Sequence, residues 1–89
     1  MLNFLLSMNK LINELEELVL WPKKPKDKQI VIEWLSKKFK FEKQYSEKEV
    51  NQIIKNHHSF NDVPLLRREL ISRLFLNRKD DGSVYWKNN

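Results

Sequence analysis

Apolar side chains recur at spacings of three and four residues along four segments of the chain, which is the period of an amphipathic α-helix. The predicted helices run near residues 3–20, 27–39, 46–58 and 63–74. The pattern then changes, because aromatic and β-branched residues on both sides of Asp80-Asp81-Gly82 are typical of two strands joined by a tight turn. The chain is therefore predicted to be mainly α with a small β-hairpin near its C-terminal end.

The first predicted helix ends at Trp21-Pro22, since proline disfavours helical geometry in the residue before it. Its apolar stripe must be covered, and two interpretations remain open. The helix packs on its own domain, or it pairs with a second copy of the chain and makes a homodimer through residues 3–20. The stripe comprises Leu5, Met8, Ile12, Leu15 and Val19, widened by Phe4, Leu11 and Leu18.

The chain divides into an amphipathic N-terminal helix over residues 1–20, a basic proline-containing linker over 21–26 and a folded domain over 27–89. A chain of 89 residues has room for one compact core. The lysines of the linker are expected either to be solvated or to touch phosphates. Asp27 is the expected N-cap of the second helix, because its carboxylate can accept from a free backbone amide.

Ser46 and Glu49 have the spacing of a capping box, so both are expected to be structural and to start the third helix. Residues 41–45 before them are expected to form a loop or a short strand that pairs with the hairpin. His57 is expected to end the helix against the core, and His58 to cap carbonyls or meet the following turn. A shared metal ion is not expected, since adjacent helical residues point about 100° apart.

The fourth helix is expected to follow a turn in which Asn61 or Asp62 is the N-cap and Pro64 fits the first helical turn. Arg68 and Ser72 project away from its apolar face, with Arg73 beside them. Arg67 lies nearer that face and is expected to have a structural role, partly buried and paired with a carboxylate. The apolar face comprises Leu66, Leu70, Ile71 and Leu74.

Gly82 is the only glycine of the chain, and it is expected to supply the positive φ that the tight turn requires. Arg78, Lys79 and Lys87 give the hairpin a basic character. The hairpin either completes the core or contacts phosphates as a wing, and both interpretations stay open. The most buried residues of the domain are expected to include Trp34, Leu35, Ile53, Ile54, Leu70 and Leu74.

The net charge of +5 is unevenly distributed. Residues 1–20 hold one lysine against three glutamates, whereas the remaining residues hold 16 Lys and Arg against 9 Asp and Glu. The basic charge thus belongs to the part of the chain with the two closely spaced helices and the hairpin. This imbalance favours association with a polyanion, although a lysine-rich face is also common as solvated surface.

Several function classes are not expected from this sequence. It has no cysteine, so a disulfide, a thiol nucleophile and a cysteine-ligated zinc are excluded. No nucleophile with its base, metal cluster or glycine-rich phosphate loop can be assembled, so we expect no enzyme, no cofactor and no small-molecule ligand. No apolar run approaches the about 20 residues of a membrane span, and the N-terminal residues lack the features of a signal peptide. A cytoplasmic protein without membrane contact is therefore expected.

Six short motifs lie between Trp21 and Lys87. They are Trp21-Pro22-Lys23-Lys24, Asp27-Lys28, Tyr45-Ser46-Glu47-Lys48-Glu49-Val50-Asn51, Phe60-Asn61-Asp62, Leu66-Arg67-Arg68-Glu69-Leu70 and Asp81-Gly82-Ser83-Val84-Tyr85-Trp86. In this order the motifs resemble a bacterial family, the domain of unknown function 2087. The resemblance implies a winged-helix-like module, of a kind found alone or joined behind the DNA-binding part of transcriptional regulators.

The order helix, turn, helix, hairpin predicts a winged helix-turn-helix domain, preceded by the amphipathic N-terminal helix. We expect a small transcription-regulator-like protein that binds double-stranded DNA. The alternative is a protein-interaction module of the same fold, which dimerises or binds a partner through the N-terminal helix. The residues expected to contact nucleic acid are Arg68, Ser72, Arg73, Arg78, Lys79 and Lys87.

Overall fold

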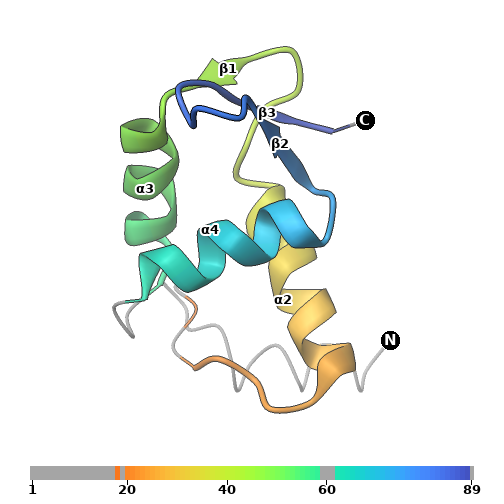
Figure 1. The fold of residues 1–89 in the computed structure, drawn as a ribbon. Coiled ribbons are helices and arrows are strands. Elements are labelled where there is room, and N and C mark those ends of the chain that lie inside the picture. The colour runs from red at the N-terminus through yellow and green to blue at the C-terminus, as the bar shows by residue number, and fades with distance from the viewer. Residues whose placement is uncertain (1–17, 19, 59–61, 89) are drawn as a thin grey trace.

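The computed structural model describes residues 18, 20–58 and 62–88, which form three helices and a three-stranded antiparallel sheet (Figure 1). The helices are α2 (Pro25–Ser36), α3 (Glu47–Asn56) and α4 (Val63–Ser72). The strands are β1 (Gln44–Tyr45), β2 (Leu76–Arg78) and β3 (Tyr85–Lys87). The fold is therefore mixed α and β. The prediction of a mainly α domain with one hairpin identified these three helices and the hairpin, and the third strand falls within residues 41–45, where a loop or a short strand was expected.

The predicted N-terminal helix over residues 3–20 lies almost wholly outside the described residues. Leu18 is described, and it is not helical. Its backbone amide donates to His57 O at 2.7 Å, and Leu18 and His58 form a parallel bridge. Leu18 is also fully buried in the core, so this part of the chain is bound to the end of α3.

Helix α2 begins at Pro25, two residues before the predicted start. Its N-cap is Lys24, so the prediction that Asp27 caps the helix is wrong. The physical reason is that Pro25 has no amide to satisfy and its fixed φ suits the first helical position. Asp27 instead lies in the first turn, where a carboxylate is favoured by the helix dipole.

Both predicted caps of the next two helices are confirmed. At α3, Ser46 Oγ accepts from the Glu49 amide at 3.1 Å, and Glu49 Oε1 accepts from the Ser46 amide at 3.0 Å. At α4, Asp62 Oδ1 accepts from the Leu65 amide at 3.2 Å. These side chains satisfy amides that have no partner within their helices, and so fix where each helix begins.

His58 occupies the space between α3 and α4, where it is buried. Its Nδ1 lies 2.7 Å from the Ile54 carbonyl oxygen, and its Nε2 accepts from the Asp62 amide at 3.0 Å. The first contact requires a proton on Nδ1 and the second a lone pair on Nε2, so the ring is in the neutral Nδ1–H form. The expectation that His58 caps a carbonyl and meets the turn is confirmed.

Leu74 corrects the predicted core. It was expected to be buried with Leu70, but its exposed fraction is 74% and its φ is 67°. Helix α4 ends at Ser72, so the helical spacing does not extend to Leu74, which follows in the left-handed conformation of a helix C-terminus. Leu76, two residues later, takes the buried position.

Strand β3 is the centre of the sheet and pairs with both β1 and β2. The short-strand interpretation of residues 41–45 is thus confirmed, since Gln44 pairs with Trp86 and Tyr45 with Tyr85. On the other side Asn77 pairs with Trp86. Gly82 has a φ of 74° in the connection between β2 and β3, as predicted.

The core lies between the sheet and the helices, which Figure 1 shows beneath the sheet. One face of the sheet supplies Tyr45, Leu76 and Tyr85 to it. Of the predicted core residues, Leu35, Ile54 and Leu70 are fully buried, whereas Trp34 and Ile53 are half-buried at its edge. The helices contribute Val31, Ile32, Leu35, Val50, Ile54, Leu66 and Leu70, and Leu18 and Phe39 complete the buried apolar set.

Candidate nucleic-acid interface

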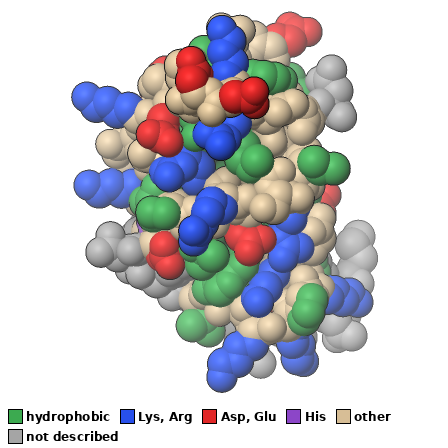
Figure 2. Space-filling view, in the orientation of Figure 1, with side chains coloured by type: hydrophobic (Ala, Val, Ile, Leu, Met, Phe, Trp, Pro, Cys, Tyr) green, Lys and Arg blue, Asp and Glu red, His purple; other side chains and the backbone are tan. Residues whose placement is uncertain are grey.

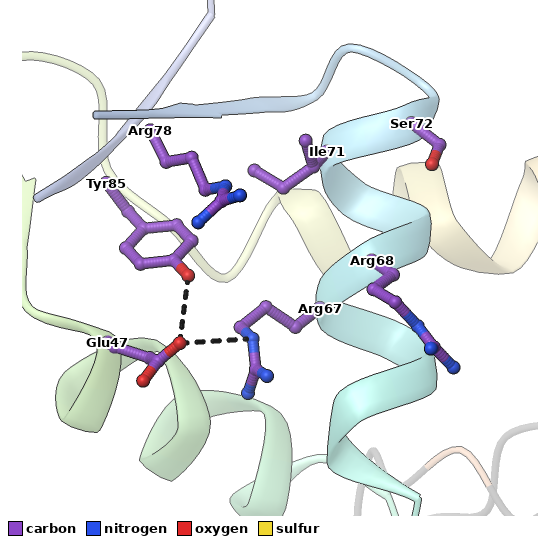
Figure 3. Close-up of a pocket in the computed structure, with 7 residues that line it drawn as sticks. All are labelled: Glu47, Arg67, Arg68, Ile71, Ser72, Arg78 and Tyr85. Atoms are coloured by element: carbon purple, nitrogen blue, oxygen red, sulfur yellow. Dashed lines mark hydrogen bonds and ion pairs between the residues drawn. The ribbon is translucent and has the colours of Figure 1, made fainter. Parts of the chain in front are cut away.

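A hollow lies between α4, the start of α3 and the inner face of the hairpin (Figure 3). It brings together Arg68, Ser72 and Arg78, which the sequence pattern had assigned to nucleic acid, and Arg67, which it had assigned to structure. Of the three arginines, Arg67 points toward Glu47 and Arg78 points into the hollow, whereas Arg68 points away from Glu47 along the outer side of α4 (Figure 3). The lining residues are Glu47, Arg67, Arg68, Ile71, Ser72, Arg78 and Tyr85.

Arg67 is held on the α3 side of the hollow. Its Nε lies 3.7 Å from Glu47 Oε1, and its NH1 donates to Asn51 Oδ1 at 2.5 Å. The expected partial burial and carboxylate partner are confirmed, since the exposed fraction of the arginine side chain is 22%. The partner is 51% exposed, so burial applies to the arginine and not to the carboxylate. Glu47 lies in the first turn of α3, which keeps its carboxylate near solvent.

Tyr85 also lines the hollow, and it contacts the same Glu47 carboxylate as Arg67. Its hydroxyl donates to Glu47 Oε1 at 3.2 Å. Burial raises the pKa of the Tyr85 hydroxyl above its ordinary value of 10.0, and the nearby Glu47 carboxylate acts in the same direction. The phenol therefore remains a neutral donor, and the negative charge in the hollow comes from Glu47.

Arg68 and Ser72 lie on the solvent side of α4, four residues apart and both exposed. This is the direction predicted from the helical period. Within the described part of the chain, the Arg68 guanidinium makes no hydrogen bond or ion pair. Its charge is therefore free to bind an anion.

Arg78 approaches the hollow from β2 and is exposed. No acidic residue among those described forms an ion pair with it. Its guanidinium passes close to Gly82, where a Cβ would come within 3.3 Å of Arg78 NH1. The glycine thus serves both the positive φ of the turn and the space for this side chain.

Arg73 does not join this hollow, although it was expected beside Arg68 and Ser72. Its Nε donates to Glu69 Oε2 at 2.8 Å, and its NH1 donates to Gln29 Oε1 of α2 at 2.7 Å. Arg73 is the C-cap of α4, so its direction is no longer that of the helical period. Its charge is neutralised within the domain.

Lys79 and Lys87 do not line this hollow, and both border a second one that includes Trp86. Lys87 pairs in register with Leu76, so its side chain leaves the sheet on the same face as Arg78 and Tyr85. Side chains along a strand alternate between its faces, so neighbouring residues 78 and 79 point in opposite directions. The Lys87 ammonium donates to Phe39 O at 3.4 Å and lies 4.3 Å from the centre of the Phe41 ring. Burial lowers the pKa of Lys87, and the positive charge of Lys37 adds to this.

Glu47 and Tyr85 are the residues that the sequence pattern did not assign to the site. The position of Tyr85 was predictable in part, because side chains alternate along a strand and one of two adjacent aromatic residues must face inward. No sequence pattern indicated the role of Glu47, since that role depends on how α3 packs against α4. In Figure 2 basic side chains are scattered over the visible face from end to end, with acidic and hydrophobic ones between them. The density of charge alone therefore does not mark the hollow.

The described residues contain no group of three or more His, Asp or Glu side chains arranged to hold a metal ion. None of the helices described here is long and apolar enough to cross a membrane.

Comparison with known proteins gives one family. Residues 17–87 match a family described as an uncharacterized protein conserved in bacteria (DUF2087). No curated protein and no solved structure matches the chain. The matched range includes every helix and strand of the described residues.

Proposed function

The chain belongs to this family of uncharacterized bacterial proteins, as its motifs predicted, and we propose that it binds double-stranded DNA as a winged helix-turn-helix protein. In this proposal α4 enters the major groove, and the hairpin contacts the adjacent backbone. A role as a transcriptional regulator follows from such binding and is part of the proposal.

The order of elements supports the winged-helix assignment. A helix and a short strand come first, two helices follow with a short connection, and two strands end the domain. The first strand pairs with the last, so the sheet has the order β1-β3-β2. This arrangement leaves one side of α4 exposed next to the hairpin, which is what a groove-binding helix requires.

The observation that carries the proposal is that Arg68 and Ser72 of α4 and Arg78 of β2 border one hollow and are all exposed. Two guanidinium groups without an acidic partner among the described residues, beside a hydroxyl, suit phosphate oxygens and the acceptors of a guanine edge. Arg67 adds a third positive charge, partly compensated by Glu47.

The test is fluorescence anisotropy of a labelled random-sequence duplex at about 50 mM and about 200 mM salt. Arg68→Ala and Arg78→Ala are expected to weaken binding, by about 1 to 3 kcal/mol if the arginine contacts a base and less if it contacts only phosphate. Lys40→Ala is the matched control, because Lys40 is exposed, carries the same charge and lines neither hollow. Equal effects of all three changes, or no binding by the wild type, would reject the proposed surface.

A protein-interaction module remains the second candidate, and exposed apolar side chains favour it. Leu74 and Phe41, with exposed fractions of 74% and 52%, line a common hollow near the ends of α2 and α4. The proposed homodimer through residues 3–20 belongs to the same candidate. Light scattering of the wild type and of Ile12→Glu tests it, because a dimer would become a folded monomer.

A further inference from the structure

The outer face of the sheet carries an aromatic side chain that the proposed DNA-binding surface does not use. Trp86 lies at the centre of this face, paired in register with Gln44 of β1 and Asn77 of β2. In antiparallel pairs such residues point to the same side, and both neighbours are exposed. The helices and the core occupy the opposite side of the sheet (Figure 1).

Trp86 is half-buried, and it is not among the apolar side chains packed against the core. Its indole N–H has no hydrogen-bond partner in the described part of the chain, and it is not a buried unsatisfied donor. The nitrogen is therefore open to solvent. Tryptophan usually finds a partner for this group when buried, so the side chain has both an apolar surface and a donor available to a ligand.

Basic residues line the second hollow beside Trp86. Lys79, which follows β2, and Lys43, which precedes β1, are both exposed. Lys79 has no ion pair with any described acidic residue. Lys43 Nζ lies 5.0 Å from the centre of the ring of Tyr45, which faces the core, so Lys79 is the lysine available beside Trp86. Glu42 is the one acidic residue in the lining of this hollow, which comprises Glu42, Lys43, Gln44, Lys79, Val84, Trp86 and Lys87.

We propose that this outer face is a second binding surface, which takes single-stranded nucleic acid. An unpaired base stacks on the Trp86 indole, and Lys79 contacts the neighbouring phosphate. Stacking on an aromatic side chain beside basic groups is the general way in which proteins hold single strands without reading their sequence. The surface is separate from the proposed duplex site, because Arg78 and Lys79 point to opposite faces of the hairpin.

The chemistry favours a single strand over the other polyanions. The bases of a duplex are stacked on each other and expose only their edges, so they have no free face for an indole. An acidic peptide would satisfy the lysines, but it supplies no planar ring unless an aromatic residue happens to lie between its carboxylates. A single strand supplies a ring and a phosphate at each nucleotide.

The experiment is anisotropy of a fluorescein-labelled oligothymidylate of about 12 nucleotides, within the site sizes of small single-strand binders. The wild type is expected to bind it. Trp86→Leu is expected to lower the affinity for the oligonucleotide about tenfold or more. Trp86→Phe keeps an aromatic ring, so it is expected to lower the affinity less. Lys79→Glu is expected to weaken binding strongly. The matched control Lys40→Glu, exposed and outside both hollows, is expected to have a smaller effect.

Arg68→Ala separates this proposal from the duplex proposal, since it should weaken duplex binding and leave oligothymidylate binding unchanged. Thermal melts establish that each variant is folded. Failure of the wild type to bind oligothymidylate, or equal affinity of the wild type and folded Trp86→Leu, would overturn the proposal. Binding of an aromatic-containing oligoglutamate peptide at Trp86 more tightly than the oligonucleotide would also overturn it.

Discussion

The Tyr85 hydroxyl donates a hydrogen bond to Glu47 Oε1 at 3.2 Å, which connects the central strand to the first turn of α3 across 38 residues of sequence. The same carboxylate oxygen lies 3.7 Å from Arg67 Nε of α4. One side chain thus joins three elements at the edge of the candidate interface. This contact adds to the core packing that holds α4 against the sheet.

Tyr85→Phe is expected to lower the free energy of unfolding at neutral pH by about 0.5 to 1.5 kcal/mol, because it removes this hydrogen bond and keeps the ring. Burial raises the pKa of Tyr85, so the stabilisation is complete below pH 10.0 and decreases as the pH rises through the folded-state value. The difference in the free energy of unfolding between the wild type and Tyr85→Phe should therefore become smaller above pH 10. Urea titrations near neutral pH and above pH 10 measure it, and an unchanged difference would contradict the assignment.

Arg67→Ala is expected to lower the free energy of unfolding modestly, by about 1 kcal/mol, since its partner Glu47 is half-exposed and remains hydrated when the arginine is removed. A buried partner would make the loss several times larger. Thermal melts of Arg67→Ala beside Glu47→Gln give the two costs. A loss of about 3 kcal/mol or more would show that Glu47 is less hydrated than its exposure indicates.

Leu74→Gly is expected to stabilise the protein by about 0.5 to 1 kcal/mol. A leucine in the left-handed conformation is strained by its Cβ, and glycine, which has no Cβ, adopts this conformation without that strain. The side chain is 74% exposed, so its removal loses little packing. Leu74→Ala is the matched control, which removes the same contacts and keeps the strain. The prediction fails if the two variants have the same melting temperature.

The Glu49→Gln variant is expected to lose less stability in acid than the wild type does. Hydrogen bonds with Ser46, first from its backbone amide and then with its side chain, lower the pKa of Glu49 below its ordinary value of 4.5. This carboxylate therefore stabilises the fold above pH 4.5, and the effect disappears as the pH falls through the folded-state value. Melting temperatures between about pH 6 and about pH 3 should fall less steeply for the variant than for the wild type.

Local chemistry made much of the fold predictable. Ser46, Asp62 and Gly82 each act within a few residues of their own position, and their roles were correctly read from the sequence. Leu74 was misassigned because helical spacing was extended beyond the helix, whose end at Ser72 is not marked by a glycine or a proline.

The candidate site was predictable only in part, because it depends on contacts between distant segments. The direction of Arg68 follows from the helical period, and the separation of Arg78 from Lys79 follows from strand alternation. The hydrogen bond from Arg73 to Gln29 joins residues 44 apart in the sequence, and it forms only because α2 packs against α4. No pattern within either helix indicates it.

Leu18 belongs to the buried core although it precedes the linker over residues 21–26. It is fully buried and hydrogen-bonded to His57, next to the histidine that contacts the Ile54 carbonyl and the Asp62 amide. A chain shortened to begin at Trp21 would retain α2, α3 and α4 and lose a buried leucine bonded to the end of α3. The helix pair is therefore expected to owe part of its stability to a residue that precedes both helices.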